Sequence, residues 1–277
     1  MTMPKVSGMM NVSKGIEYCY PFIEAITSFL PVCDEIVVVV DPYSHDGTEE
    51  LIRKTFDEKV RVVSMPFDLE HWGRISWGLQ KTAGYLACRG DCVLMFDADG
   101  ILHEKDIEKT KEATAKFMAQ TERPVAHWTK YRFYGARNYF FQPKHYGIFN
   151  KKFLGDKLDF FDNTKGAVSL RRFTDDEPSM RMMFGVTLFG YEHTFDTPPI
   201  YEKKLWEYGK MLDRAQKLDR QLGDFVERQI KQARERMART NKSMEIEQHP
   251  KVIQERLRSL TSGQYGFNYF YLMDKYV

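Results

Sequence analysis

Two carboxylates lie one residue apart where a strongly apolar stretch of the chain ends. The run Cys92–Phe96 has the length and composition of a strand buried on both faces of a parallel sheet, and Asp97 and Asp99 follow it. Ligands of open α/β sheets bind beyond the carboxyl ends of the strands. Since carboxylate oxygens are hard ligands, the pair predicts a site for Mg²⁺ or Mn²⁺ carrying a phosphate. The alternative is that Asp97 caps a turn and Asp99 caps the next helix.

An earlier apolar run also ends in an acid. Ile36–Val40 is followed by Asp41, which opens the segment Asp-Pro-Tyr-Ser-His-Asp-Gly-Thr. A carboxylate at a strand end can accept hydrogen bonds from a base or a ribose. The Ser44-x-Asp46 turn is expected to hold this loop and to start the next helix.

Alternating strands and helices must position these acids. The strand patterns are Lys5–Val12, Ile36–Val40, Val60–Ser64 and Cys92–Phe96, and the helical patterns between them are Ile16–Leu30, Glu49–Phe56 and Arg74–Cys88. This alternation predicts a doubly wound α/β protein with a parallel sheet. Further along, strands are expected at Val125–Phe133, Lys165–Phe173 and Met180–Phe189. We expect one catalytic domain over residues 1–200 and a helical extension over residues 201–277.

The two aspartate motifs carry a family resemblance over roughly Val6–Asp106. Their order and spacing resemble those of GT-A nucleotide-sugar glycosyltransferases, most of all the large inverting family numbered two. The resemblance implies a Rossmann-like, mostly parallel sheet flanked by helices. It also implies that the first acid reads uracil or ribose, and that the Asp-x-Asp pair binds ribose and a divalent metal on the diphosphate.

This resemblance assigns roles to individual residues. It implies a nucleotide-sugar site formed by Asn11, Asp41, Ser44, Asp46 and Asp97. The metal, Mn²⁺ or Mg²⁺, would be held by Asp97 and Asp99, with His193 as a third ligand. Gly100 stands where the family usually has a glutamate, which puts a sugar-side contact in doubt. Arg74 and Lys81 could reach the diphosphate, or they could be surface charges on a helix.

Inverting transfer needs a carboxylate that takes the proton from the acceptor hydroxyl. An acidic run, Asp175-Asp176-Glu177, lies late enough in the chain to face the acceptor. We expect Asp176 to be this base, with Asp175 and Glu177 as the next candidates.

The segment Arg123–Lys152 holds seven Lys or Arg, nine aromatic residues and no Asp or Glu. Aromatic faces beside cations can stack on sugar rings, or on bases with phosphates nearby. We expect Arg132, Arg137 and Lys144 to bind the acceptor. The alternative is an antiparallel strand pair with an aromatic core face.

Together these features predict a metal-dependent glycosyltransferase that moves a sugar from a nucleoside-diphosphate sugar, expected to be UDP-linked, to an acceptor hydroxyl with inversion. The expected acceptor is a carbohydrate or glycan. One alternative is transfer onto a hydroxymethylated base in double-stranded DNA. Another is a non-enzymatic nucleic-acid-binding module, which leaves both aspartate motifs unexplained. Sugar-nucleotide synthesis fits poorly, because Gly8–Lys14 lacks the expected Gly-rich basic loop.

Composition limits the remaining possibilities. The net charge of +2 favours no partner class, and the start of the chain lacks the apolar region of a signal peptide. The longest aliphatic run, Ile36–Val40, is too short to span a membrane. Four cysteines at no metal-ligand spacing predict reduced thiols in a cytoplasmic protein. The helical pattern Leu205–Met237 could pack on the domain or pair with a second copy in a homo-oligomer.

Overall fold

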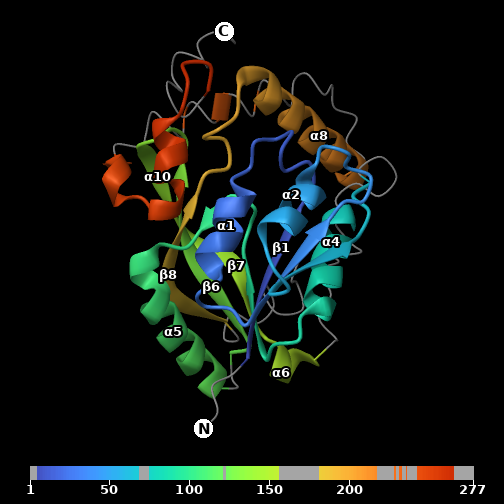
Figure 1. The fold of residues 1–277 in the computed structure, drawn as a ribbon, viewed down its shortest axis with the longest axis vertical. Helices are drawn as coiled ribbons and strands as arrows, with labels where there is room; N and C mark the ends of the chain where they lie inside the picture. Colours follow the sequence, from blue (N-terminus) through green and yellow to red (C-terminus); the bar gives the residue numbers. More distant parts are fainter. Residues whose placement is uncertain are drawn as a thin grey trace.

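The computed structural model shows one twisted sheet covered by helices on both faces (Figure 1). It describes residues 5–68, 75–120, 123–155, 181–216, 228, 231–232, 235 and 242–264. The first half of the sheet is parallel, in the spatial order β3 (Val60–Ser64), β2 (Glu35–Val40), β1 (Val6–Val12) and β4 (Cys92–Met95). These strands confirm the sequence prediction, because long apolar runs form where both faces of a strand are covered.

The second half of the sheet is mixed. It continues from β4 through β7 (Asn138–Asn150), β6 (Val125–Phe133), β8 (Arg181–Gly190) and β5 (Gly100–Ile101), and β9 (Lys242–Ser243) pairs with β7. The β7 strand is antiparallel to β4 and β6, whereas β8 is parallel to β6 and antiparallel to β5. The antiparallel strand pair considered for the basic aromatic segment is therefore present.

Helices cover the two faces of the sheet unequally. They are α1 (Phe22–Phe29), α2 (Thr48–Thr55), α4 (Ile75–Ala87), α5 (Ile107–Ala119), α6 (Lys151–Leu154), α8 (Pro198–Gln216) and α10 (Lys251–Arg258), with short 3-10 turns at Glu104–Asp106 and Ile246–Gln248. Helices α1, α2, α5 and α10 contribute to the larger core, while α4 and α6 cover the opposite face. Alternation along β1 explains this division, since Met10 points into the larger core and Met9 into the smaller one. The predicted fold class is confirmed.

One close contact joins the two halves of the sheet next to the end of β4. The Trp128 indole N–H donates to the Met95 carbonyl oxygen at 2.9 Å, and the ring packs edge-on against Phe29 and Phe184. Gly147 permits this approach, because a Cβ there would lie 2.3 Å from the Met95 oxygen and 2.7 Å from the indole nitrogen. The strand that leads to Asp97 and Asp99 is thereby held against β6 and β7.

Helix α10, in the C-terminal part of the chain, joins the same core. Ile253 and Leu257 of α10 are buried beside α1, and Arg256 pairs with Glu24 at 3.1 Å. Helix α8 begins at Pro198. The division at residues 200 and 201 stays a prediction, as does pairing of two copies through the helical segment. The predicted Lys165–Phe173 strand lies outside the described residues. Beyond Gln216, the described part of the predicted Leu205–Met237 helix is limited to residues 228, 231–232 and 235, which are helical.

No helix in the described ranges has the length and apolar character needed to cross a membrane. The cysteines Cys19, Cys33, Cys88 and Cys92 are all free thiols, as expected.

Candidate active site

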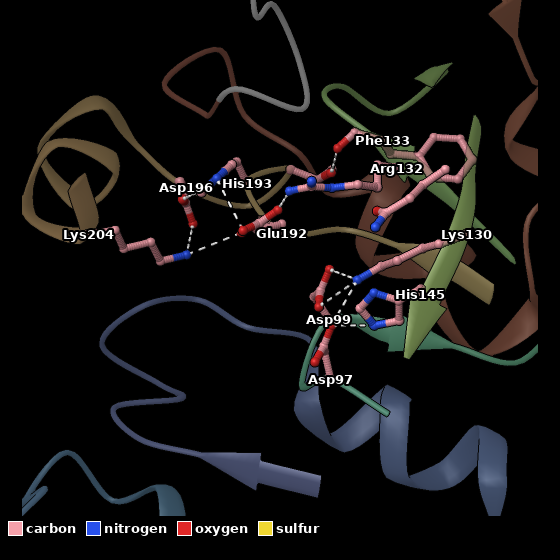
Figure 2. A network of polar contacts seen from close by, with 12 residues as sticks. Asp97, Asp99, Lys130, Arg132, Phe133, His145, Glu192, His193, Asp196 and Lys204 are labelled. Carbon is pink, nitrogen blue, oxygen red and sulfur yellow. Dashed lines mark hydrogen bonds and ion pairs between the residues drawn. The ribbon is translucent and has the colours of Figure 1, made fainter. Parts of the chain in front are cut away.

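The two aspartates at the end of β4 enclose a lysine ammonium (Figure 2). The Nζ atom of Lys130, on β6, lies 3.2 Å from Asp97 Oδ2 and 3.2 Å from Asp99 Oδ1. It also lies 3.1 Å from Asp99 Oδ2. His145, on β7, places its Nε2 atom 2.9 Å from Asp97 Oδ2. Neither Lys130 nor His145 was expected at this site.

The surrounding strands fix the position of this lysine. The Lys130 side chain is 4% exposed and that of Asp99 is 7% exposed, whereas the Asp97 side chain is 36% exposed. The lysine stem runs along the backbone of Gly190, where an added Cβ would lie 2.0 Å from Lys130 Cε. The ammonium therefore lies beneath the carboxylates, and Asp97 forms the solvent-facing rim of the site.

Charge compensation is strong at this site. Burial alone would raise the pKa of Asp97, but the neighbouring His145 and Lys130 outweigh it and hold this pKa well below its usual value. Burial alone would lower the pKa of Lys130, yet Asp99 and Asp97 raise it above the usual range. Asp97 is thus an anion and Lys130 a cation at neutral pH.

A signal for Lys130 was present in the sequence. Lys130 follows Trp128 by two residues in a strand pattern, so both are expected to point to the same face of the sheet, and a lysine buried there requires an acidic partner. The candidate partners were the two aspartates already singled out. What the sequence could not supply was the pairing of β6 and β7 that brings Lys130 and His145 to β4.

The predicted three-ligand metal set is not assembled. His193 bonds through Nδ1 to Asp196 Oδ2 at 3.0 Å, and Figure 2 shows it in a cluster separate from Asp97 and Asp99. Across the described ranges, no group of three or more His, Cys, Asp or Glu side chains could hold a metal ion. Asp99 Oδ2 is buried without a well-aligned hydrogen bond, but the Lys130 ammonium lies 3.1 Å from it. As folded, this donor set does not fit a divalent cation.

The cluster that contains His193 is a structural tie between β8 and α8. Lys204 of α8 donates to Asp196 Oδ1 at 2.7 Å and to the Glu192 carbonyl oxygen at 3.3 Å. Burial lowers the pKa of His193, and the opposing hydrogen bond with Asp196 does not restore it. His193 and Lys204 thus share Asp196 as a partner. Through this shared carboxylate, the imidazole helps to position the start of α8.

The loop after β2 lies beside the aspartate pair at the same edge of the sheet. Asp41 is buried, and its Oδ1 atom accepts from the Tyr43 and Phe67 amides, each at 3.2 Å. Asn11, at the end of β1, donates to the Gln80 side chain at 3.2 Å. The Asp41 carboxylate therefore stabilises the loop after β2 through one of its two oxygens.

Asp46 and Ser44 join the loop after β1 to the loop after β2. The Asp46 carboxylate accepts from the Ile16 and Glu17 amides at 3.0 Å, from Ser44 Oγ at 3.0 Å and from the Thr48 amide at 3.1 Å. Burial alone would raise its pKa, but these hydrogen bonds outweigh it and lower the pKa from its usual value. Four hydrogen bonds use the lone pairs that a nucleotide would need.

Replacing Asp46 by alanine should therefore destabilise the fold by about 1–3 kcal/mol at pH 7, because four donors lose a charged acceptor. Since the folded-state pKa is lowered, this contribution is present above the unfolded pKa of about 3.9 and is lost as the pH falls through the folded-state pKa. Urea unfolding of both proteins at pH 7 and at about pH 3 should show the difference shrinking in acid. The exposed Asp57, changed to alanine, is the control. A difference that stays constant with pH would contradict the role of the Asp46 charge.

The remaining expected site residues divide into two groups. Lys81 lies on α4, and its charge contributes to the lowered pKa of Asp97, which places it near the aspartate pair. Arg74, Asp175, Asp176 and Glu177 lie outside the residues that the structure describes.

Most of the described cations of the basic aromatic segment have internal partners. Arg132 forms an ion pair with Glu192, and Arg137 lies 3.0 Å from Glu245. Lys151 donates to the carbonyl oxygens of Tyr85, Leu86 and Cys88 at the end of α4. Lys144 is exposed. The segment therefore presents less free positive charge than its composition suggests.

Comparison with known proteins identifies the family. Residues 22–176, more than half of the chain, match the model of glycosyl transferase family 2. The chain belongs to this family and is a glycosyltransferase. A comparison with curated protein sequences finds no match.

Solved structures with a similar fold include two of TarS from S. aureus and one mannosyltransferase. The TarS 1-349 structure is 13% identical, with 80% of this chain and 68% of that chain covered and a TM-score of 0.45. A longer TarS structure has 41% of its chain covered, with 13% identity, 80% coverage of this chain and a TM-score of 0.46. Mannosyltransferase PcManGT from Pyrobaculum calidifontis, in complex with GDP-Man and Mn²⁺, is 13% identical over 78% of this chain and 65% of that chain, with a TM-score of 0.49. The assignment rests on the family match and not on these distant likenesses.

Proposed function

We propose that this protein transfers a sugar from a UDP-linked donor to the hydroxyl of a carbohydrate acceptor, with inversion at the anomeric carbon. The observation that carries the proposal is the meeting of three strand ends at one edge of the sheet. Strands β1, β2 and β4 are parallel neighbours, so Asn11, Asp41 and Asp97 follow or end adjacent strands on the same side. Ligands of open parallel sheets bind at that side.

Different residues of the site have different roles in the proposed reaction. Asp41 would accept a hydrogen bond from the uracil N–H or a ribose hydroxyl. Negative charge develops on the departing diphosphate, and preorganised positive groups at that position stabilise the transition state. Lys130 and Lys81 supply positive charge beside the aspartate pair. These lysines stand where the sequence predicts Mn²⁺ or Mg²⁺, since the described donor set does not fit a divalent cation.

The acceptor hydroxyl must lose its proton as it attacks. Asp176, with Asp175 and Glu177 beside it, remains the proposed source of this base, because inversion requires a carboxylate opposite the leaving group. A carbohydrate is favoured over DNA as the acceptor because Arg132 and Arg137 already have acidic partners. If the protein binds hydroxymethylated duplex DNA and this binding weakens steeply between about 50 and 200 mM salt, the DNA acceptor is favoured instead.

A panel of UDP-, GDP-, CDP- and dTDP-sugars tests the donor class. Without an acceptor, the protein should hydrolyse a UDP-sugar slowly. With a matching glycan, it should consume the same UDP-sugar faster, by transferring the sugar. Hydrolysis confined to another nucleotide would overturn the UDP assignment, and no hydrolysis or binding with any donor would overturn the proposed function.

The substitution Asp41→Asn tests whether Asp41 recognises the uracil or the ribose of the nucleotide. Asparagine keeps an oxygen that can accept from the Tyr43 and Phe67 amides, but it lacks the second acceptor oxygen that would face uracil or ribose. Binding of UDP and of UDP-sugars should both weaken by about 1–3 kcal/mol, with little change in thermal stability. Calorimetry measures the affinities, and Asp57→Asn in an exposed loop is the matched control. Equal affinities for wild type and Asp41→Asn would remove Asp41 from the nucleotide site.

A further inference from the structure

The aspartate pair already contains a cation that belongs to the chain. Lys130 Nζ lies 3.1 to 3.2 Å from oxygens of both Asp97 and Asp99, the two carboxylates that the sequence predicts as metal ligands. Figure 2 shows the ammonium pointing between the two carboxylates, with His145 beside it. The inference that follows rests on the proposed function, because it concerns the cation beside the diphosphate of the same sugar donor.

We propose that Lys130 is the resident cation of the aspartate pair, and that donor binding and sugar transfer therefore proceed without a divalent metal ion. The lysine offsets one of the two carboxylate charges and keeps an ammonium fixed beside the diphosphate site. Asp97 and Asp99 then serve to hold the ammonium in place and to present carboxylate oxygens to the donor.

Geometry opposes replacement of the ammonium by a metal. Magnesium needs oxygen ligands at about 2.0–2.1 Å in near-octahedral arrangement, and it retains several waters. Entry of such an ion would leave the Lys130 ammonium buried without its acidic partners, which is strongly unfavourable. The lysine also has little room to withdraw, because its Cε atom lies against the backbone at Gly190 on β8. Its side chain is only 4% exposed.

The hydrogen-bonding capacity of the ammonium fits a role toward an anion. A lysine ammonium has three N–H donors. The described carboxylates account for two hydrogen bonds, one to Asp97 and one to Asp99. With Lys81 contributing to the field at Asp97, the site carries positive charge from two lysines. Two lysines offset the charge of the two aspartates, so a diphosphate near the Asp97 rim meets less repulsion than two unpaired carboxylates would give.

Binding of Mn²⁺ to the protein alone tests the proposal without requiring any glycosyl transfer. Wild type should bind Mn²⁺ no better than a Lys116→Met control, which removes an exposed lysine on α5. Lys130→Met keeps the apolar stem and removes the charge, so it should bind Mn²⁺ at least about tenfold more tightly than wild type. Adding Asp99→Asn to Lys130→Met should abolish this gain. Electron paramagnetic resonance of free Mn²⁺ measures all four proteins.

Gly190→Ala provides a second variant if Lys130→Met does not fold. Its methyl group would displace the lysine stem while keeping the charge in the chain, so it should also gain Mn²⁺ affinity. Tight Mn²⁺ binding by wild type that Asp99→Asn removes would overturn the proposal. Failure of every folded Lys130 or Gly190 variant to gain Mn²⁺ affinity would overturn it as well.

Nucleotide binding separates this proposal from the proposed function. With EDTA, wild type should bind UDP within about twofold of its affinity in Mn²⁺, whereas Lys130→Met should lose at least about tenfold in EDTA and recover in Mn²⁺. A wild type that binds UDP only with Mn²⁺ overturns the metal-free proposal and leaves the proposed function standing. A wild type that binds no nucleotide under either condition overturns the proposed function, while the Mn²⁺ titration still decides the role of Lys130.

Discussion

Replacing Asp99 by asparagine should lower kcat/KM for sugar transfer by about 10²–10³-fold, the size expected when one preorganised charged contact of a transition state is removed. Asparagine has nearly the same shape but no charge, so the Lys130 ammonium would lose one of its two anionic partners. The cation would then be free to shift toward Asp97, away from the position that the diphosphate requires. Initial rates measured over a range of UDP-sugar concentrations give kcat/KM for both proteins.

Stability must be followed in the same experiment, because Asp99 is almost fully buried. Breaking a buried ion pair can destabilise a protein by about 3–5 kcal/mol, although asparagine keeps one acceptor oxygen and should lose less. Rates should therefore be compared well below the unfolding transition of the variant. Asp57→Asn is the matched control, since it makes the same change in an exposed loop. A folded Asp99→Asn protein with transfer within about twofold of wild type would exclude Asp99 from the reaction.

Replacing Trp128 by alanine should have the largest effect on stability, about 3–5 kcal/mol, as expected for a large buried aromatic side chain. The ring is fully buried between α1 and β8, with Phe29 and Phe184 edge-on to it. Its loss would leave a cavity and an unpaired Met95 carbonyl oxygen beside the end of β4. Guanidinium unfolding measures the change in the free energy of unfolding.

Trp128→Phe separates the ring from its hydrogen bond. Phenylalanine fills most of the same space but cannot donate to Met95, so we expect a smaller loss of about 1–3 kcal/mol. Transfer activity should also fall in Trp128→Phe. Met95 lies two residues before Asp97, so the lost hydrogen bond would let the aspartate pair shift. Unfolding free energies for Trp128→Ala and Trp128→Phe that both match wild type would contradict the anchoring role of this contact.

Local patterns explain why much of the fold could be predicted from the chain alone. The strands at Val60–Ser64 and Val125–Phe133 have the predicted bounds, because β-branched and aromatic runs between turn residues favour extended backbone regardless of distant partners. Acids directly after Val40 and Phe96 must lie at one edge of a parallel sheet, since parallel neighbours end on the same side. Where local signals compete, the prediction is less accurate: the helix expected from Ile16 begins only at Phe22, after Pro21.

The sequence by itself therefore determined the fold class, the family and the edge of the sheet where the acids gather, because each depends on short-range periodicity and strand ends. Only the tertiary structure decided what those acids contact. Lys130 and His145 reach Asp97 because β7 inserts between β4 and β6, and His193 is drawn to Asp196 at the start of α8 instead. Strand pairing across more than thirty residues and the room left by Gly190 have no local signature. The identity of the cation between the aspartates was thus set by long-range packing, which no spacing in the chain encodes.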